Sequence, residues 1–327
     1  MTGPNRSSGS AVVSGASADQ WSDADPWTVL RLILWSADYL TNKGVSSGRL
    51  DAEHLLAHVL GVKRLQLYLE FERPLAQEEL DAFRPLLRRR AAREPLQYVI
   101  GHQPFRELVL TVAPEVLIPR PETEQLVDVI LNWLAAEHIQ QPTVLDIGTG
   151  TGAIALSLAA EAEATVTATD VSIAALGIAR SNRLAAGLVQ RVELLDGSLF
   201  EPVEPGASFH VIVSNPPYIA EVDEETLEPE VRDWEPRRAL FAGADGLDVI
   251  RGLVSGARRH LRPDGLFAME VGSGQARTVA SLLETSGDYA AVRIEKDHAG
   301  LERFVLAQGA KTDHRGLAEP APSTGDV

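Results

Sequence analysis

The chain has 327 residues, which is enough for two domains of ordinary size, and 45% of them are hydrophobic. It contains no cysteine, so disulfides, thiolate metal sites and a cysteine nucleophile are excluded. The formal net charge of −16 disfavours binding to phosphate backbones, and no stretch approaches the roughly 20 apolar residues that span a bilayer. We therefore expect a cytoplasmic protein with no membrane partner and no sequence-specific contact with nucleic acid.

Both ends of the chain are polar and rich in small residues. Residues 1–25 contain no apolar run of the kind found in secretory signals, so we expect a disordered leader there. Residues 309–327 combine polar side chains with Pro and Gly, which predicts a disordered tail.

Residues 26–97 show apolar positions at helical spacing and no alternating strand pattern. Leu30 lies in the first predicted helix. Asp51 is a candidate N-cap of the second, which ends at Gly61, and a third run covers 77–93. The sequence predicts a small N-terminal helical bundle.

Residues 98–121 change character. Phe105, Leu108, Leu110 and Val112 show an alternating pattern that predicts a short hairpin, and three prolines follow before residue 122. We expect this segment to link two domains.

From 122 to 308 predicted strands and helices alternate, which implies an α/β fold with a mostly parallel sheet covered on both faces. We expect strands at 143–147, 165–169, 192–195, 210–214, 265–270, 291–295 and 303–307, and helices at 122–137, 152–160, 172–186, 248–261 and 275–285.

The first of these strands runs directly into Gly148, Thr149, Gly150, Thr151 and Gly152. Closely spaced glycines let the backbone turn sharply and let a ligand approach without a Cβ clash. The loop lacks the Gly-Lys-Ser/Thr ending of a P-loop, and its third glycine falls one place early for a dinucleotide fingerprint.

The second strand ends at Asp170, about 20 residues beyond the loop, where a carboxylate can accept both hydroxyls of a ribose. A glycine loop with an acidic strand end suits a nucleoside that carries an amino acid and no phosphate. That description fits S-adenosylmethionine, whereas a tight glycine turn without a ligand is the plainer alternative.

The fourth strand ends in Asn215, Pro216, Pro217 and Tyr218. An amide nitrogen is a poor nucleophile because its lone pair is delocalised. The Asn215 side-chain carbonyl and the Pro216 backbone carbonyl can accept its two hydrogens, two prolines stiffen the loop, and the Tyr218 ring can pack on a planar group. The tetrad predicts methyl transfer to a planar nitrogen by alignment, without a strong general base, although a rigid turn is the plainer alternative.

These motifs resemble the HemK/PrmC family, the glutamine N5-methyltransferases of peptide-chain release factors. The resemblance covers nearly all of 51–305, and its most specific piece is the string Leu-Ile-Pro-Arg-Pro-Glu-Thr-Glu at 117–124. It implies a helical N-terminal domain that helps dock the release factor, a β-hairpin linker, and a class I, Rossmann-like methyltransferase domain. It also implies that Gly148 to Gly152, Asp170 and Asn215 contact the cofactor, and that Asn215 to Tyr218 hold the glutamine of a Gly-Gly-Gln motif.

One position departs from the family pattern. The family usually has Asp after the third strand of this domain, where this chain has Ser198 followed by Leu199. Ser198 can still hydrogen-bond an adenine edge, Asp196 is a candidate substitute, and Leu199 is expected to pack on the adenine.

Three further features allow two interpretations each. His54 and His58, beside Glu53, are either a metal pair or an ordinary helix face. The arginines between 84 and 93 either meet a partner or form a solvated face, and the acidic stretch 221–235, which contains Trp234, is either a lid or a polar loop.

The substrate also has alternatives. The same chemistry could act on a ribosomal-protein glutamine or on the adenine amino group of DNA, since the tetrad alone is shared with DNA adenine methyltransferases. A cofactor-binding module without catalysis is the alternative from another class.

Overall fold

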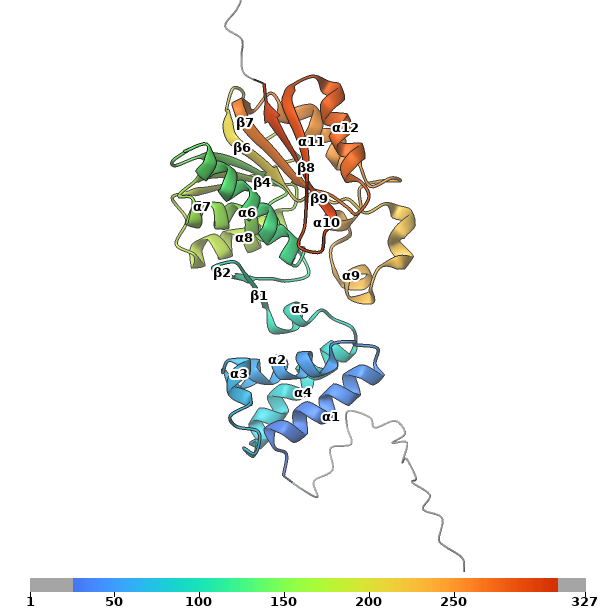
Figure 1. The fold of residues 1–327 in the computed structure, drawn as a ribbon. Coiled ribbons are helices and arrows are strands. Elements are labelled where there is room, and N and C mark those ends of the chain that lie inside the picture. The colour runs from blue at the N-terminus through green and yellow to red at the C-terminus, as the bar shows by residue number, and fades with distance from the viewer. Residues whose placement is uncertain (1–25, 311–327) are drawn as a thin grey trace, which may run out of the picture. The chain divides into compact units, whose positions relative to one another are not determined.

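The structure, a computed structural model, describes residues 26–310 and divides into two compact units at Ile100/Gly101 (Figure 1). Each unit has its own hydrophobic core. The leader expected at 1–25 and nearly all of the tail expected at 309–327 lie outside the described residues. Between residues 26 and 310, no helix is both long enough and apolar enough to cross a membrane.

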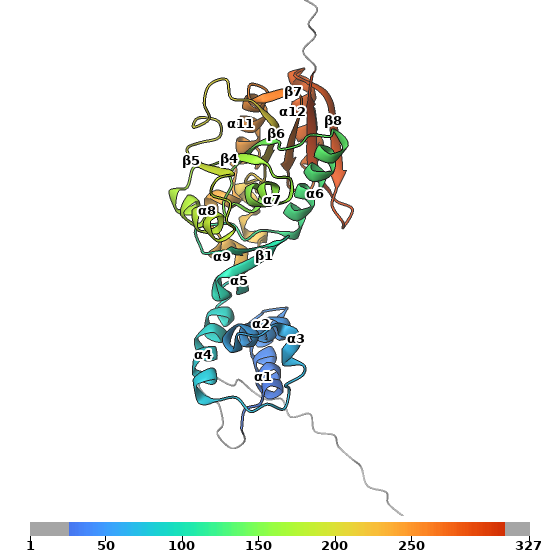
Figure 2. The same cartoon turned by 90° about the vertical axis from the view of Figure 1, so that its left-hand side faces the viewer.

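The first unit is helical, as its spacing predicts. Thr28 caps the first helix by accepting a hydrogen bond from the Arg31 backbone N–H at 3.3 Å, and Gly61 ends the second in the left-handed conformation at φ 65°. The helices of this unit pack together as a bundle (Figure 2). Their apolar faces form a core that includes Leu55 and Phe83. The helices are α1 (Val29–Asn42), α2 (Gly48–Leu60), α3 (Arg64–Leu67), α4 (Gln77–Ala91) and α5 (Leu96–Ile100).

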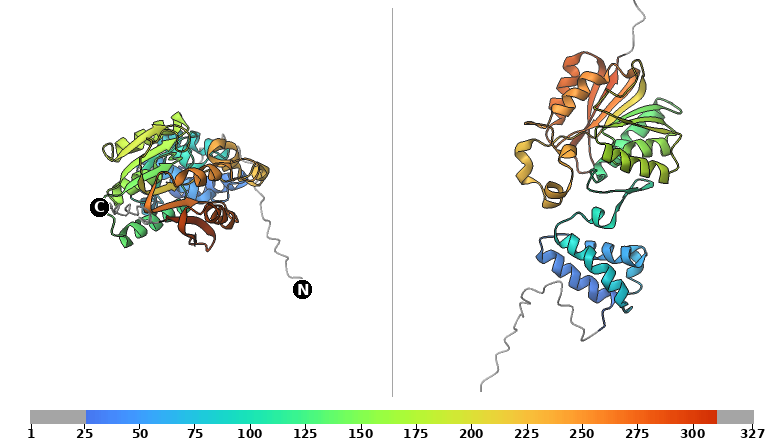
Figure 3. Two further views of the ribbon diagram at one scale, coloured as in Figure 1. Left: turned by 90° about the horizontal axis from the view of Figure 1, so that it is seen from above. Right: turned by 180° about the vertical axis from the view of Figure 1, so that it is seen from behind.

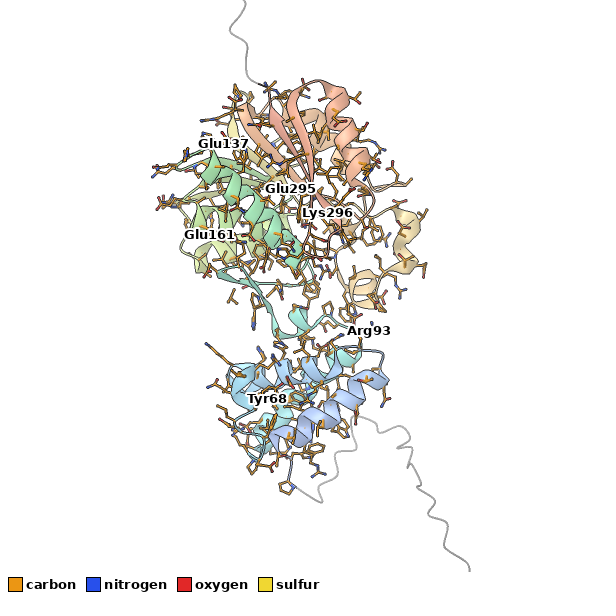
Figure 4. All side chains as sticks on the ribbon, viewed as in Figure 1. Tyr68, Arg93, Glu137, Glu161, Glu295 and Lys296 are labelled. Carbon is orange, nitrogen blue, oxygen red and sulfur yellow. The ribbon has the colours of Figure 1, made fainter. Side chains whose placement is uncertain are left out.

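The second unit opens with the predicted hairpin, formed by β1 (His102–Phe105) and β2 (Leu108–Thr111). Phe105 and Leu110 are buried in the larger core. Arg106 in the turn donates two hydrogen bonds of 2.7 Å to Glu161, a residue labelled in Figure 4. The hairpin is therefore held to the rest of the second unit through both its apolar residues and its turn.

A seven-stranded sheet forms the centre of the second unit, in the order β5-β4-β3-β6-β7-β9-β8. The first five are parallel, and β9 is antiparallel to both neighbours. The strands are β3 (Thr143–Ile147), β4 (Thr165–Asp170), β5 (Val192–Asp196), β6 (Phe209–Ser214), β7 (Leu261–Glu270), β8 (Tyr289–Lys296) and β9 (Glu302–Gly309). This mostly parallel α/β architecture is the one expected from the alternating pattern.

Helices cover both faces of the sheet (Figure 3). On one face α6 (Pro121–Ala136) and α7 (Ala153–Glu161) pack on side chains such as Val144 and Val213. On the other face α11 (Asp248–Ala257) and α12 (Ala276–Ser286) pack on the alternate side chains, such as Leu145 and Ile212. The remaining helices are α8 (Ile173–Ala185), the 3₁₀ turn η1 (Glu221–Thr226), α9 (Pro229–Trp234) and α10 (Arg237–Leu240).

One predicted helix is too long. The helix expected at 248–261 ends at Ala257, and the following strand begins at Leu261 rather than at 265. The reason is tertiary: Leu261 pairs with Phe209 of β6, whose backbone N–H donates to the His260 carbonyl at 2.8 Å. The short elements α3, α5, η1, α9 and α10 were not predicted, because four to six residues are too few to show a period.

Candidate active site

A pocket of about 500 Å³ opens at the carboxyl ends of β3, β4 and β6. The order of the sheet reverses at this point, since β3 lies between β4, which follows it in the chain, and the more distant β6. Open α/β sheets bind ligands in the crevice outside such a reversal. The volume is in the range of ordinary small-molecule sites.

The glycine loop forms one wall of the pocket. Gly148 and Gly150 have φ of 74° and 54°, and a Cβ added to either would meet no atom within 4 Å. Both positions therefore need glycine for backbone conformation and leave open space for a ligand. Thr149 and Thr151 also line the pocket, and the backbone N–H groups of Gly148 and Thr149 donate to the Thr169 carbonyl at 2.9 and 3.0 Å.

Gly152 differs from the other two glycines of the loop. It is the N-cap of α7 with φ 85°, and it does not line the pocket. A Cβ there would lie 3.1 Å from the Leu156 side chain. Its place in the structure indicates close packing of the loop on α7, so the expected contact with the cofactor stays a prediction.

Asp170 lies at the end of β4 and lines the pocket. Its Oδ2 accepts a hydrogen bond from the Gly150 backbone N–H at 2.8 Å, and its Oδ1 accepts one from Ser172 at 2.9 Å. Burial raises the pKa of this carboxyl, and the two backbone N–H groups act against that shift. Each oxygen keeps a second lone pair, so the carboxylate can shape the loop and accept ribose hydroxyls together.

Asp146, which sequence reasoning did not single out, supports the same loop through a hydrogen bond from Thr149. It is fully buried, and its Oδ2 accepts a hydrogen bond from the Thr149 hydroxyl at 2.6 Å. Burial raises the pKa of Asp146 to about 7. In the sequence, only its position two residues before the loop could have indicated this role.

Three members of the tetrad, Asn215, Pro216 and Pro217, also line the pocket. The Asn215 amide donates through Nδ2 to the Thr123 hydroxyl at 2.9 Å. Its Oδ1 is buried and meets no hydrogen-bond donor among the residues that the structure describes. A buried acceptor without a donor is costly and rare, so this atom marks a place for an incoming N–H group.

Tyr218 lies differently from the rest of the tetrad. It does not line the pocket, and its half-buried ring packs against the apolar cluster under α11 and α12. Its backbone carbonyl accepts a hydrogen bond from Gln275 Nε2 at 2.9 Å. Burial raises the pKa of its phenol above the ordinary value, which keeps it neutral. The expected packing on a substrate amide stays a prediction.

The expected adenine side of the pocket is formed by Ser198 and Leu199. Leu199 has φ 51°, a left-handed conformation that is uncommon for a branched residue, and its carbonyl accepts from the Thr169 hydroxyl at 3.2 Å. Unusual backbone conformations of this kind concentrate at ligand sites. Asp196 is exposed and does not line the pocket, so Ser198 rather than Asp196 faces that space.

The acidic stretch 221–235 forms η1 and α9, and none of its residues lines the pocket. Trp234 is half-buried outside the pocket. The chain returns to the pocket just after this stretch, with Pro236, Arg238 and Ala239. The buried Glu235 carboxylate is bound by Arg120.

The pocket also contains residues that the sequence interpretation left without a role. Thr123, Val116 and Leu117 come from the segment before and at the start of α6, and Val249 comes from α11. The string at 117–124 was noticeable only through the family resemblance, and its place at the site follows from the fold.

The two ambiguous features of the helical unit have structural partners. Glu53, beside the histidine pair, binds Arg64 at 2.7 Å and accepts a hydrogen bond from the Tyr68 hydroxyl at 2.9 Å. No group of three or more potential metal ligands occurs anywhere in residues 26–310. In the arginine run, Arg90 is buried and binds Asp51 at 2.7 Å, so part of that run holds the bundle together.

The sheet order, the glycine loop with its acidic strand end and the Asn-Pro-Pro-Tyr tetrad together define an S-adenosylmethionine-dependent methyltransferase. Two family models match, the PrmC N-terminal domain over residues 31–101 and the methyltransferase small domain over residues 124–229. The open glycine loop and the lone pairs left on Asp170 fit the nucleoside of that cofactor.

Curated relatives match over almost their whole length. The release factor glutamine methyltransferase of Rhodopirellula baltica is 41% identical, over 88% of this chain and 99% of the relative. That of Geobacter sulfurreducens is 44% identical, over 85% and 96%. The chain therefore belongs to the release factor glutamine methyltransferase family.

Among solved structures, the hMettl16 catalytic domain in complex with MAT2A 3'UTR hairpin 1 is similar in fold. The TM-score is 0.53 at 17% identity, and the match covers 70% of this chain and 82% of that one. At this identity the likeness concerns the fold alone.

Proposed function

We propose that this enzyme transfers a methyl group from S-adenosylmethionine to the side-chain amide nitrogen, N5, of the glutamine in the Gly-Gly-Gln motif of peptide-chain release factors. The observation that carries the proposal is the buried Asn215 Oδ1, which has no donor among the described residues and belongs to a side chain bordering the cofactor pocket. A substrate amide N–H is the donor that would complete it. Membership of the family supports the choice of glutamine.

Bound in the pocket lined by Gly148, Gly150 and Asp170, S-adenosylmethionine would supply a methyl group on a positively charged sulfur, and that sulfur would keep the electron pair of the S–C bond. Asn215 Oδ1 and the Pro216 carbonyl accept the two hydrogens of the amide and aim its nitrogen at the methyl group. As the new N–C bond forms, these two dipoles stabilise the positive charge that develops on nitrogen. One amide proton then leaves to water, which returns the amide to neutrality.

The helical unit, residues 26–100, is proposed to dock the release factor, and no direct sequence-specific contact with nucleic acid is part of the proposal. The net charge of −16 favours a protein over a polyanionic substrate. A ribosomal-protein glutamine and a DNA adenine amino group are the alternative acceptors. A module that binds the cofactor without catalysis is the alternative from another class.

The proposal is tested by mass spectrometry of a cognate release factor after incubation with this protein and S-adenosylmethionine. One added methyl on the motif glutamine is expected, and none is expected when that glutamine is replaced by asparagine. Asn215→Ala should lower kcat/KM by about 10²- to 10³-fold, because it removes one fixed acceptor. Cofactor binding without methylation of the release factor would redirect the search to ribosomal proteins first.

A further inference from the structure

We propose that Thr123 and Glu270 are positioning residues that turn the carbonyl oxygen of the Asn215 amide toward the substrate and thereby select an amide over a carboxylate. The inference rests on the proposed function for the identity of the substrate. It concerns a relay of three side chains from three elements, which we call the Asn215 relay: Asn215 after β6, Thr123 in the first turn of α6, and Glu270 at the end of β7.

Two hydrogen bonds form the relay. Asn215 Nδ2 lies 2.9 Å from Thr123 Oγ1, and Thr123 Oγ1 lies 2.8 Å from Glu270 Oε2. Thr123 and Glu270 are only 4% and 2% exposed, so water competes little for these groups. Thr123 also borders the pocket, which places the relay directly behind the proposed reacting atoms.

The direction of the hydrogen bonds follows from the chemistry of the three groups. In its ionised form the Glu270 carboxylate only accepts, so the single Thr123 hydroxyl hydrogen is then donated to Glu270 Oε2. The Thr123 oxygen must then accept, and the amide group of Asn215 that faces it must be NH₂. Because an amide has one NH₂ and one carbonyl, Asn215 Oδ1 is turned to the other side, where it meets no donor in the described part of the chain.

This orientation determines which substrate head group is bound. Oδ1 attracts an N–H group and repels a second acceptor oxygen. A glutamine can present N–H there, whereas a glutamate presents a carboxylate oxygen. If Asn215 could turn over, its NH₂ would face the pocket and would favour the carboxylate instead.

The test compares Thr123→Val, which keeps the shape of the side chain but removes its hydroxyl, with Thr123→Ser, which restores the hydroxyl. The matched control is Thr143→Val, a change outside the pocket that removes a hydroxyl lying 2.9 Å from His210 Nδ1. For each protein we would measure kcat and KM, the dissociation constant of S-adenosylmethionine and the melting temperature. Binding of the release factor would be compared with that of its variant carrying glutamate in place of the motif glutamine.

We expect Thr123→Val to lower kcat about 10- to 100-fold, because a misaimed amide loses its approach to the methyl group. The preference for glutamine over glutamate should fall toward unity, and cofactor binding should change less than threefold. Thr123→Ser should restore both quantities toward the wild-type values. Wild-type kcat and wild-type discrimination in Thr123→Val would overturn the proposal.

A substrate-independent measurement separates this proposal from the proposed function. With ¹⁵N-labelled asparagine, the side-chain NH₂ hydrogens of Asn215 should exchange slowly in the wild type and in Thr123→Ser, and rapidly in Thr123→Val. Slow exchange in the wild type together with no methylation of any release factor would overturn the function and leave the relay standing. Equal exchange in the wild type and Thr123→Val would overturn the relay even if methylation occurs.

Discussion

Asp170 holds two backbone N–H groups and also lines the pocket, so one side chain can contribute to both the fold and ligand binding. Its two oxygens hold the backbone N–H groups of Gly150 and Ser172, and its remaining lone pairs border the pocket. The sequence predicted only a ligand contact for Asp170 and gave no sign that this side chain also holds two backbone N–H groups. Loss of the charge should affect the loop and the cofactor together.

For Asp170→Asn we expect S-adenosylmethionine to bind about 10- to 100-fold more weakly, because the new NH₂ faces a backbone N–H and a charged acceptor is lost. Isothermal titration calorimetry measures the change. Asp196→Asn, an exposed carboxylate outside the pocket, is the control and should bind normally. Equal affinities for all three proteins would contradict the assignment of Asp170.

Asp146 makes stability depend on pH. Its pKa is raised by burial from 3.8 to about 7, so the folded state holds this proton more tightly than the unfolded state. The resulting stabilisation is complete below pH 3.8 and is lost as the pH rises through about 7. Glu270, raised from 4.5 to about 7 by burial, acts in the same direction.

We therefore expect Asp146→Asn, which imitates the protonated form, to weaken the fall in melting temperature between pH 5 and pH 7.5. The difference between variant and wild type should amount to about 1–3 kcal/mol of unfolding free energy over that window. Thermal unfolding in a series of buffers measures it. Parallel curves for the two proteins would show that Asp146 ionises normally.

At the scale of elements, Asn182 joins the hairpin to the glycine loop. This buried residue of α8 accepts from the Thr111 backbone N–H at 2.8 Å and donates to the Thr111 and Thr151 carbonyls at 3.1 and 2.9 Å. Its amide thus satisfies the backbone N–H and carbonyl of Thr111 at the end of β2 and holds the Thr151 carbonyl of the glycine loop. Neither contact is apparent from an asparagine in a helical run.

Asn182→Ala should lower the free energy of unfolding of the second unit by about 1–3 kcal/mol per unsatisfied buried group and weaken cofactor binding. Urea unfolding and calorimetry measure the two effects. Ser181→Ala, its exposed neighbour whose hydroxyl bonds only within the helix, should change neither. An Asn182 variant that loses stability but binds the cofactor normally would restrict its role to the hairpin.

A second connection links the start of α6 to the segment after α9. Arg120 binds Glu235, a carboxylate whose pKa is raised by burial in spite of the nearby guanidinium. The Arg120 side chain is one-third exposed, so solvent screens part of the attraction. Removing the arginine nevertheless leaves a buried carboxylate without its cationic partner.

Arg120→Ala should therefore cost about 1–3 kcal/mol, whereas the double variant Arg120→Ala with Glu235→Gln should recover part of that loss. A double-mutant cycle based on chemical unfolding measures the coupling. Additive effects of the two substitutions would mean that Arg120 and Glu235 are not energetically coupled.

At the scale of the whole molecule, the two units have separate cores. Leu55 is fully buried in the helical unit, and Leu126 is fully buried in the methyltransferase unit. Units with their own cores commonly unfold separately. The two leucines therefore provide a matched pair of probes.

Leu55→Ala should destabilise only the helical unit, by about 2–5 kcal/mol, and leave S-adenosylmethionine binding intact. Leu126→Ala should destabilise only the methyltransferase unit and weaken S-adenosylmethionine binding. Hydrogen exchange followed by mass spectrometry, resolved by peptide, distinguishes them. Loss of protection across both units in either variant would show that they unfold as one.

The class of fold and the two main motifs were predictable because their signals are local. Strand-helix alternation, glycines after a buried strand and a proline-stiffened strand end are all contained in short windows of sequence. The parallel sheet follows from that alternation. Because the carboxyl ends of parallel strands lie at the same edge of a sheet, Gly148, Asp170 and Asn215 come together there. Helix ends such as Ala257 were less predictable, because strand pairing decides them.

What the sequence determined by itself was the architecture and the cofactor, and it predicted which residues at the strand ends would meet that cofactor. Only the tertiary structure showed that Thr123 lies behind Asn215, 92 residues away, and beside Glu270, 147 residues away. It also placed Tyr218 against a core and Gly152 against a helix. Hydrogen bonds between such distant residues depend on strand order and helix packing, which no short window contains, and these long-range contacts decide how the tetrad is oriented.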